Sequence, residues 1–208
     1  MKINRRQFVR NLGLGTASLS MGSLISTSSC APSGDSRDKR GKVSDDDQFL
    51  FIGDDIAIAQ TEYGKVQGYL LNHVYTFLGV PYGADTSGKN RFMPPQKPEP
   101  WTDVRPAVFY GNTAPQRMEN RWPNNYGTFA DHWNYWDVSE DCLYLNVWTP
   151  GIADGKKRPV LVWLHGGGFT NGSGIEQDGY HGENISREGD IVFCSINHRL
   201  GPIGFSDL

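Results

Sequence analysis

The stretch PVLVWLHGGGF, from Pro159 to Phe169, decides the fold. Its first half, Val160 to Leu164, is a continuous apolar run, which is typical of a strand buried on both faces of a mostly parallel sheet. A second run of this kind extends from Ile191 to Ile196. Between the two runs, Asn184 to Glu188 followed by Gly189 predicts a short helix with a glycine C-cap. A helix between two buried strands indicates an α/β fold.

The second half of the stretch places three glycines directly after a strand. Glycine suits a site where backbone N–H groups must approach a negatively charged oxygen, because a side chain there would block the approach. A phosphate-binding turn is the alternative, but the spacings GxxxxGK[ST] and GxGxxG are both absent. We therefore expect backbone donors at Gly167 and Gly168, in a loop supported by His165, Gly166 and Phe169.

Short strands are predicted upstream of this stretch. They extend from Ile56 to Thr61, Val66 to Leu71 and Tyr75 to Phe77, and Leu143 to Trp148 adds another. The segment from Leu78 to Trp101 is rich in Gly and Pro and is predicted to be a loop. The fold class expected is α/β, with an antiparallel meander that leads into a mostly parallel central sheet.

A second irregular segment extends from Tyr110 to Asp141 and is rich in aromatic residues from Tyr126 to Trp136. Two interpretations of these aromatic side chains stay open. They line the entrance of a pocket for apolar or aromatic ligand groups, or they simply bury themselves against the surface of the domain.

The first 30 residues differ in composition from the rest. Met1 to Arg10 is basic without an acid, and Leu12 to Thr27 is small and apolar, which is the pattern of a signal peptide. The run is too short and too polar for a membrane span. Arg5 and Arg6 resemble the twin-arginine export signal. We expect export by a bacterial cell, to the periplasm or the medium or to a lipid anchor.

Cys30 closes the signal-like segment at a position where bacterial lipoproteins are cleaved and lipidated. A lipid anchor to the membrane is one interpretation, and an incidental cysteine near a cleavage site is the other, since Thr27 stands where the lipidation motif usually has Leu. Residues 31–48 are Ser, Asp, Lys, Arg and Gly with little to bury, which predicts a flexible tether.

Charge and cysteine content exclude several classes of protein. A net charge of -3 without a basic stripe excludes a nucleic-acid partner. Three cysteines exclude a disulfide framework. A bridge between Cys142 and Cys194 stays open, but the apolar surroundings of Cys194 favour a buried free thiol.

Three further segments join the glycine loop in one pattern. They are FLGVPYG with RFMPPQKPEPW (Phe77–Gly83 and Arg91–Trp101), SEDCLYLNVWTP (Ser139–Pro150) and INHRLGPIGF (Ile196–Phe205). With them the chain resembles the type-B carboxylesterases, the family of para-nitrobenzyl esterases and cholinesterases, which usually has Tyr at the position of His198. The resemblance implies that residues 49–208 are the N-terminal portion of an α/β-hydrolase domain.

The same resemblance implies hydrolysis of small-molecule carboxylic esters through a serine acyl-enzyme, without metal or organic cofactor. Gly167 and Gly168 would form the oxyanion hole. The nucleophile motif GxSxG is absent, and Ser206 comes nearest to it. The serine, acid and base are therefore expected beyond Leu208, and this chain alone should be inactive. The alternative is a non-catalytic, cholinesterase-like binding or adhesion protein.

Charged residues in these segments are interpreted as structural. We expect Glu140 and Asp141 to form ion pairs with Arg91 and Arg199, because charges near a core must be paired. His198 lies between strand and loop and precedes any nucleophile, so it is not expected to be the catalytic base. The family often joins the position of Cys142 to a cysteine in a segment that reads GNTAPQ here, so the resemblance implies that this bridge is absent, with Ala114 in the partner position.

Overall fold

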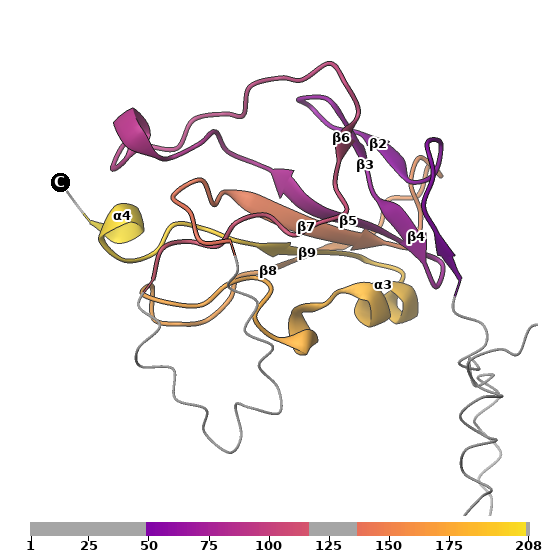
Figure 1. Ribbon diagram of the computed structural model, residues 1–208. Helices are drawn as coiled ribbons and strands as arrows, with labels where there is room; N and C mark the ends of the chain where they lie inside the picture. Colours follow the sequence, from indigo (N-terminus) through magenta and orange to yellow (C-terminus); the bar gives the residue numbers. More distant parts are fainter. Residues whose placement is uncertain (1–48, 117–136, 207–208) are drawn as a thin grey trace, which may run out of the picture. The chain divides into compact units, whose positions relative to one another are not determined.

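The computed structural model describes residues 49–116 and 137–206. Its main sheet has six strands in the order β1, β4, β5, β7, β9, β8 (Figure 1). Their bounds are β1 Leu50–Phe51, β4 Tyr69–Leu71, β5 Val74–Pro81, β7 Tyr144–Thr149, β8 Val160–Trp163 and β9 Val192–Ile196. The neighbouring strands run antiparallel, except that β8 and β9 are parallel.

The prediction of a mostly parallel central sheet is wrong for the described part of the chain, where the sheet is mixed and mostly antiparallel. A parallel pair needs a crossover connection, whereas antiparallel strands can follow each other through a turn. Helix α3 (Glu183–Gly189) supplies the crossover between β8 and β9. By contrast, β4 and β5 are joined by a tight turn at Asn72 and His73, which both have positive φ angles.

A second, smaller sheet contains β2 (Ile58–Gln60), β3 (Lys65–Gln67) and β6 (Arg105–Pro106). The predicted strand from Val66 to Leu71 is therefore divided between two sheets, with the division at Gly68. A Cβ atom at Gly68 would collide with the carbonyl oxygen of Thr76 in β5. Only glycine allows the backbone to pass this close to the neighbouring strand.

Strand β5 continues beyond its predicted end at Phe77 and reaches Pro81. Its register against β7 shifts between Phe77 and Val80, which marks a β-bulge. The predicted loop therefore begins later than Leu78. The proline is tolerated because β4 pairs with β5 only as far as Thr76, so Pro81 lies beyond the end of its neighbour on that side.

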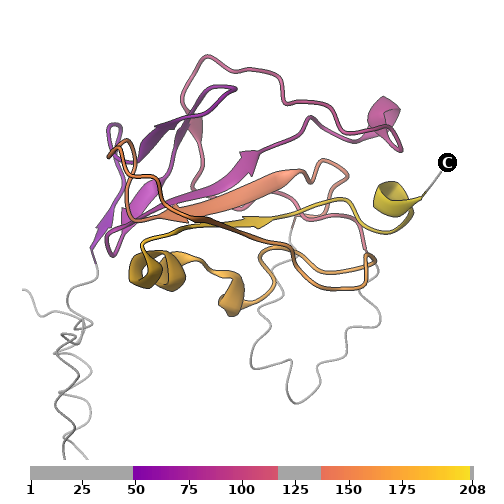
Figure 2. The ribbon, with the colours of Figure 1, turned by 180° about the vertical axis from the view of Figure 1, so that it is seen from behind.

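The main sheet is covered on its two faces by different elements (Figures 1 and 2). The small sheet lies over one face, and α3 lies over the other with the 3-10 turn η3 (Asp178–Tyr180). The core under the small sheet contains buried apolar residues from both sheets: Ala57, Val66, Phe77, Val80 and Ala107. The core on the other face contains Val74, Leu78, Trp148 and Phe193.

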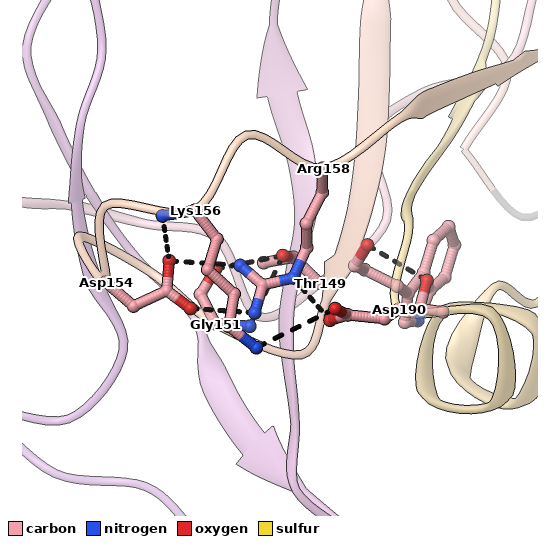
Figure 3. Close-up of polar contacts among 8 residues, drawn as sticks. Thr149, Gly151, Asp154, Lys156, Arg158 and Asp190 are labelled. Carbon is pink, nitrogen blue, oxygen red and sulfur yellow. Dashed lines mark hydrogen bonds and ion pairs between the residues drawn. The ribbon is translucent and has the colours of Figure 1, made fainter.

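Helix α3 follows the predicted position but ends differently. The residue with left-handed backbone is Asp190 (φ 46°) and not Gly189. Aspartate tolerates this conformation better than most residues, and Asp190 is held there by Arg158. The Arg158 guanidinium lies 2.7 Å from Asp154 and 2.7 Å from Asp190 (Figure 3). These contacts tie the connection between β7 and β8 to the end of the helix.

Strand β8 is exposed, contrary to the prediction that both of its faces are buried. Its exposed fractions range from 64% at Val160 to 36% at Leu161. The strand occupies one edge of the sheet, and no described residue pairs with its outer side. Strand β9, which has neighbours on both sides, is buried at Phe193, Cys194 and Ser195 as expected.

Two short helical elements complete the described residues, η2 (Gly88–Asn90) and α4 (Gly201–Phe205). No helix in the described ranges is long and apolar enough to cross a membrane. The predicted signal peptide (1–30), Cys30 and the tether (31–48) lie outside the described residues. So does the aromatic segment from Tyr126 to Trp136.

Candidate active site at the glycine loop

The glycine loop follows β8 directly, at the edge where the two parallel strands end. Three successive residues have positive φ angles: Gly167 at 120°, Gly168 at 60° and Phe169 at 65°. A Cβ atom at Gly167 would collide with the carbonyl oxygen of Asn171, so that position has no room for any other residue. Around Gly168 no atom lies within 4 Å of the Cβ position. The loop is thus closed on one side and open on the other.

Two carbonyl groups of the loop are held by hydrogen bonds. The Gly166 oxygen lies 2.8 Å from His165 Nδ1, which must carry the hydrogen because a carbonyl can only accept. The Gly167 oxygen accepts hydrogen bonds from the N–H groups of Thr170 and Asn171, both at 3.2 Å. The loop backbone is therefore fixed at the two peptide groups that contain the predicted donors.

These carbonyl contacts determine where the two predicted donors point. In a trans peptide the N–H is directed opposite to the C=O of the preceding residue. The N–H groups of Gly167 and Gly168 therefore point away from His165 Nδ1 and from the Thr170 turn. Neither donates a hydrogen bond to any residue of the described part of the chain. Two free, adjacent backbone donors are what binding of an oxyanion requires.

A cavity of about 590 Å³ lies beside this loop. Gly166 and Gly168 form part of its wall. Most of the remaining wall is apolar and includes Leu143, Leu164, Ile196, Leu200 and Phe205. Tyr82 also lines the cavity and donates a 2.7 Å hydrogen bond to the Asn197 carbonyl, while burial raises the pKa of its phenol. The cavity can therefore hold a small apolar group next to the backbone donors.

The aromatic residues at both ends of the loop contact the segment that follows β9. The His165 and His198 rings are parallel, with centroids 4.5 Å apart and an angle of 6°. The Phe169 ring contacts Phe205, with centroids 4.7 Å apart. His165 is 9% exposed and Phe169 is 66% exposed. All five residues named for the loop, from His165 to Phe169, thus lie together at one edge of the sheet.

Sequence reasoning missed Gln116 as a support of this loop. Its side-chain amide exchanges two hydrogen bonds with the backbone of Gly172, at 2.8 and 3.0 Å. A Cβ atom at Gly172 would collide with the Gly166 oxygen. Gln116 thus holds a glycine that packs directly behind the donor loop. The available signal is its place in the segment GNTAPQ, which also contains Ala114.

The expected structural ion pairs are confirmed only in part. Arg91 contacts Glu140 at 2.7 Å, as predicted. Arg199, however, donates to the Met93 carbonyl at 2.8 Å, and Asp141 accepts a 2.8 Å hydrogen bond from the Tyr144 hydroxyl. The predicted pairing of Arg199 with Glu140 or Asp141 is therefore wrong for the described part of the chain, where the guanidinium donates to a main-chain carbonyl instead.

The two cysteines of the described ranges are buried free thiols, so the bridge between them is not formed. Burial raises the pKa of Cys142 to about 12 and that of Cys194 to about 11. Ala114 packs in one buried cluster with Cys142 and Leu200. No group of three or more His, Cys, Asp or Glu side chains within the described ranges could hold a metal ion.

Comparison with known proteins places this site in context. The model of the "Carboxylesterase family" matches residues 55–208. The chain is 45% identical over 148 residues to phenmedipham hydrolase of Pseudarthrobacter oxydans, a match that covers 71% of this chain and 29% of that protein. It is 39% identical over 154 residues to para-nitrobenzyl esterase of Bacillus subtilis strain 168, with 73% and 29% covered.

The chain is also similar to solved structures of esterases. An esterase from Clostridium hathewayi matches with a TM-score of 0.69 and 38% identity, over 77% of this chain and 30% of the other. A thermophilic PNB esterase matches with a TM-score of 0.61 and 37% identity, over 73% and 29%. The chain spans about 29% of the length of the two curated relatives.

Proposed function

Because this chain belongs to the carboxylesterase family, we propose that it forms the N-terminal, oxyanion-binding portion of a serine hydrolase that acts on carboxylic esters. The observation that carries this proposal is the pair of free N–H groups at Gly167 and Gly168. Their direction is fixed by hydrogen bonds to the carbonyl groups behind them.

In the proposed reaction, a serine hydroxyl attacks the ester carbonyl while a histidine takes its proton. The carbonyl oxygen becomes negatively charged in the tetrahedral intermediate. Gly167 and Gly168 donate to this oxygen together with the N–H that follows the serine. The alcohol leaves, water attacks the acyl-enzyme, and the acid is released. The residues of this chain thus stabilise charge and do not transfer protons.

We assign the strand that precedes the catalytic serine to the exposed edge of β8. The outer side of β8 carries backbone groups that no described residue pairs, and its side chains are exposed on both faces. A further strand parallel to β8 would satisfy these groups and would end beside the glycine loop. A serine on the turn after that strand would lie within reach of the two donors.

The apolar wall of the cavity supports a small ester with an apolar group as substrate. Aliphatic and aromatic side chains, among them Leu143, Leu164 and Phe205, line this space next to the donors. Burial of such a group beside the reacting carbonyl would contribute about 25 cal/mol for each Å² removed from water.

We also propose that the protein is exported. The basic start of the chain, the apolar run that follows it and the adjacent Arg5 and Arg6 support this proposal. Replacement of both arginines by lysine should retain the protein in the cytoplasm of a bacterial host. Metabolic labelling with a fatty acid, compared between the natural sequence and Cys30→Ala, separates lipid attachment from simple cleavage.

The proposed function is tested by hydrolysis of p-nitrophenyl esters and by labelling with a fluorophosphonate, followed by intact-mass measurement. The complete protein should turn over the ester and gain one covalent adduct. The 208-residue chain should do neither. A complete protein that shows no turnover and no adduct would support the non-catalytic, cholinesterase-like binding protein instead. Turnover by the 208-residue chain would contradict the assignment of the serine to another segment.

A further inference from the structure

Four aromatic rings connect the two ends of the glycine loop through the segment that follows β9. His165 stacks on His198 at 4.5 Å, and His198 meets the edge of Phe205 at 5.9 Å and 87°. Phe205 in turn contacts Phe169 at 4.7 Å. The chain of rings begins and ends at the two residues that flank the glycines. We call these four residues the ring clamp.

A backbone hydrogen bond supports the same connection. The N–H of Gly201 donates to the carbonyl oxygen of Phe169 at 2.7 Å. Phe169 has a φ of 65°, a conformation that is rare for a bulky residue and persists only where the surroundings enforce it. The ring contact with Phe205 and the bond from Gly201 both act on this residue. The end of the loop is thus held by side chain and main chain together.

The start of the loop depends on the position of one imidazole. His165 Nδ1 donates to the Gly166 carbonyl and so fixes its direction. The Gly167 N–H belongs to the same trans peptide group and therefore points the opposite way. The His165 ring is enclosed between the backbone of Gly172 and the flat face of His198. His198 is itself oriented by a 2.9 Å hydrogen bond from its Nδ1 to the Arg199 carbonyl. A change at His198 therefore reaches the donor through His165.

We propose that His198 is a positioning residue that fixes the oxyanion donors by stacking on His165, with Phe205 as the second element of the ring clamp. Its effect on catalysis rests on the proposed function, whereas the stacking itself does not. The main requirement at this position is a flat ring, because the edge contact with Phe205 still orients the ring when the hydrogen bond to Arg199 is lost. Phenylalanine at position 198 should therefore preserve the stacking on His165. Asparagine should not, because its side chain is polar but has no aromatic ring.

Ring stacking is tested directly by NMR of the 208-residue chain with labelled histidine, since the chain has five histidines that single substitutions can assign. The ring current of His198 should shift the carbon-bound protons of His165 upfield. His198→Asn should remove this shift, and His198→Phe should keep a shift of the same sign. The matched control is His73→Asn at an exposed position whose φ of 65° asparagine tolerates, and it should leave the His165 signals unchanged.

The consequence for catalysis is tested in the complete protein with a chromogenic ester. His198→Asn should lower kcat by about ten- to a hundredfold, the loss expected from a misplaced catalytic group, with KM changed by less than about twofold. His198→Phe should recover most of this loss, and His73→Asn should lose nothing. If His198→Asn does not fold, Phe205→Leu replaces it, and the prediction is again a loss in kcat with an unchanged KM.

The two proposals fail in different ways. An unchanged His165 signal in the His198→Asn chain, or a complete protein that keeps its kcat with this substitution, would overturn the ring clamp and leave ester hydrolysis standing. A complete protein without any ester hydrolysis would overturn the proposed function. In that case the NMR comparison alone decides whether His198 positions the loop.

Discussion

The side-chain oxygen of Asn146 in β7 accepts a 3.0 Å hydrogen bond from the backbone N–H of Gly79 in β5. Gly79 lies at the bulge of β5, where the register against β7 shifts. The same amide donates to the hydroxyl of Ser195 in β9 at 3.1 Å. Asn146 is 2% exposed. A single buried amide thus links three neighbouring strands at the point where the backbone pairing of β5 with β7 is interrupted.

Replacement of Asn146 by leucine should destabilise the fold by about 2 kcal/mol, because it leaves the Gly79 N–H and the Ser195 hydroxyl buried without a partner. The measurement is equilibrium unfolding in urea. Asn184→Leu, at an exposed position of α3, is the matched control and should change the free energy of unfolding by less than about 0.5 kcal/mol. Equal effects of the two substitutions would contradict the role of the buried amide.

The contacts of Arg158 should make stability depend on pH in the acidic range. The Arg158 guanidinium lowers the pKa of Asp154 from its usual 3.8 to about 2, and it also lowers the pKa of Asp190. A carboxyl group with a lowered pKa in the folded state stabilises the fold above its unfolded pKa, and this contribution is lost as the pH falls through the folded value. The stabilisation is therefore complete above about pH 4 and disappears toward pH 2.

Urea unfolding of the natural chain and of Arg158→Leu between pH 2 and pH 6 measures this effect. The difference in midpoint should be present above pH 4, shrink toward pH 2 and decrease with added salt. Lys157→Leu removes the same charge from an exposed side chain that makes no ion pair within the described ranges. Its difference from the natural chain should stay flat, and a parallel pH dependence of both variants would contradict the assignment.

The two buried thiols should be unreactive in the folded chain. Their raised pKa values keep the thiolate fraction low at pH 8, and burial limits access. Alkylation followed by mass spectrometry should modify Cys142 and Cys194 rapidly only after unfolding in denaturant. A reducing agent should leave the unfolding midpoint unchanged, because no disulfide joins these residues. Rapid modification of either thiol in the folded chain would contradict the buried arrangement.

The sequence predicts the positions of the strands better than the way in which they pair. The apolar runs predict β8 and β9 within a residue or two, because short runs of β-branched and aromatic residues favour a strand even where, as in β8, the side chains are exposed. Whether neighbouring strands pair in parallel or antiparallel is not predicted, because it depends on connections between distant segments. The bulge at Gly79 and the split at Gly68 also escape prediction: both depend on a close approach of two backbones that no periodicity records.

The candidate site is also predicted only in part from the sequence. The motif alone predicts the donors at Gly167 and Gly168, and they remain a proposal that the loop geometry supports. Gln116 and the stacking partner of His165 were missed, because each acts across more than thirty residues of sequence. The link that Asn146 makes between strands is also missing from the predictions. A polar residue inside an apolar strand is a signal for such a link, since buried polar side chains are uncommon without a partner.

The donor role of the loop predicts a loss of activity in the complete protein when Gly167 is replaced by alanine. The added Cβ atom collides with the Asn171 carbonyl and the φ of 120° is closed to alanine, so the peptide group must turn. Removal of one oxyanion donor lowers kcat by about 100- to 1000-fold. Gly179→Ala, at a glycine with no atom within 4 Å of its Cβ position, is the control and should keep full activity.

The most direct test of oxyanion binding by this loop is the affinity of a transition-state analogue, an alkyl boronic acid, for the complete protein and its Gly167→Ala variant. A group that acts only in the transition state should change the inhibition constant and kcat/KM by the same factor. We predict that the inhibition constant rises by about 100-fold or more, in step with the fall in kcat/KM. An unchanged inhibition constant in the Gly167→Ala variant would contradict the account.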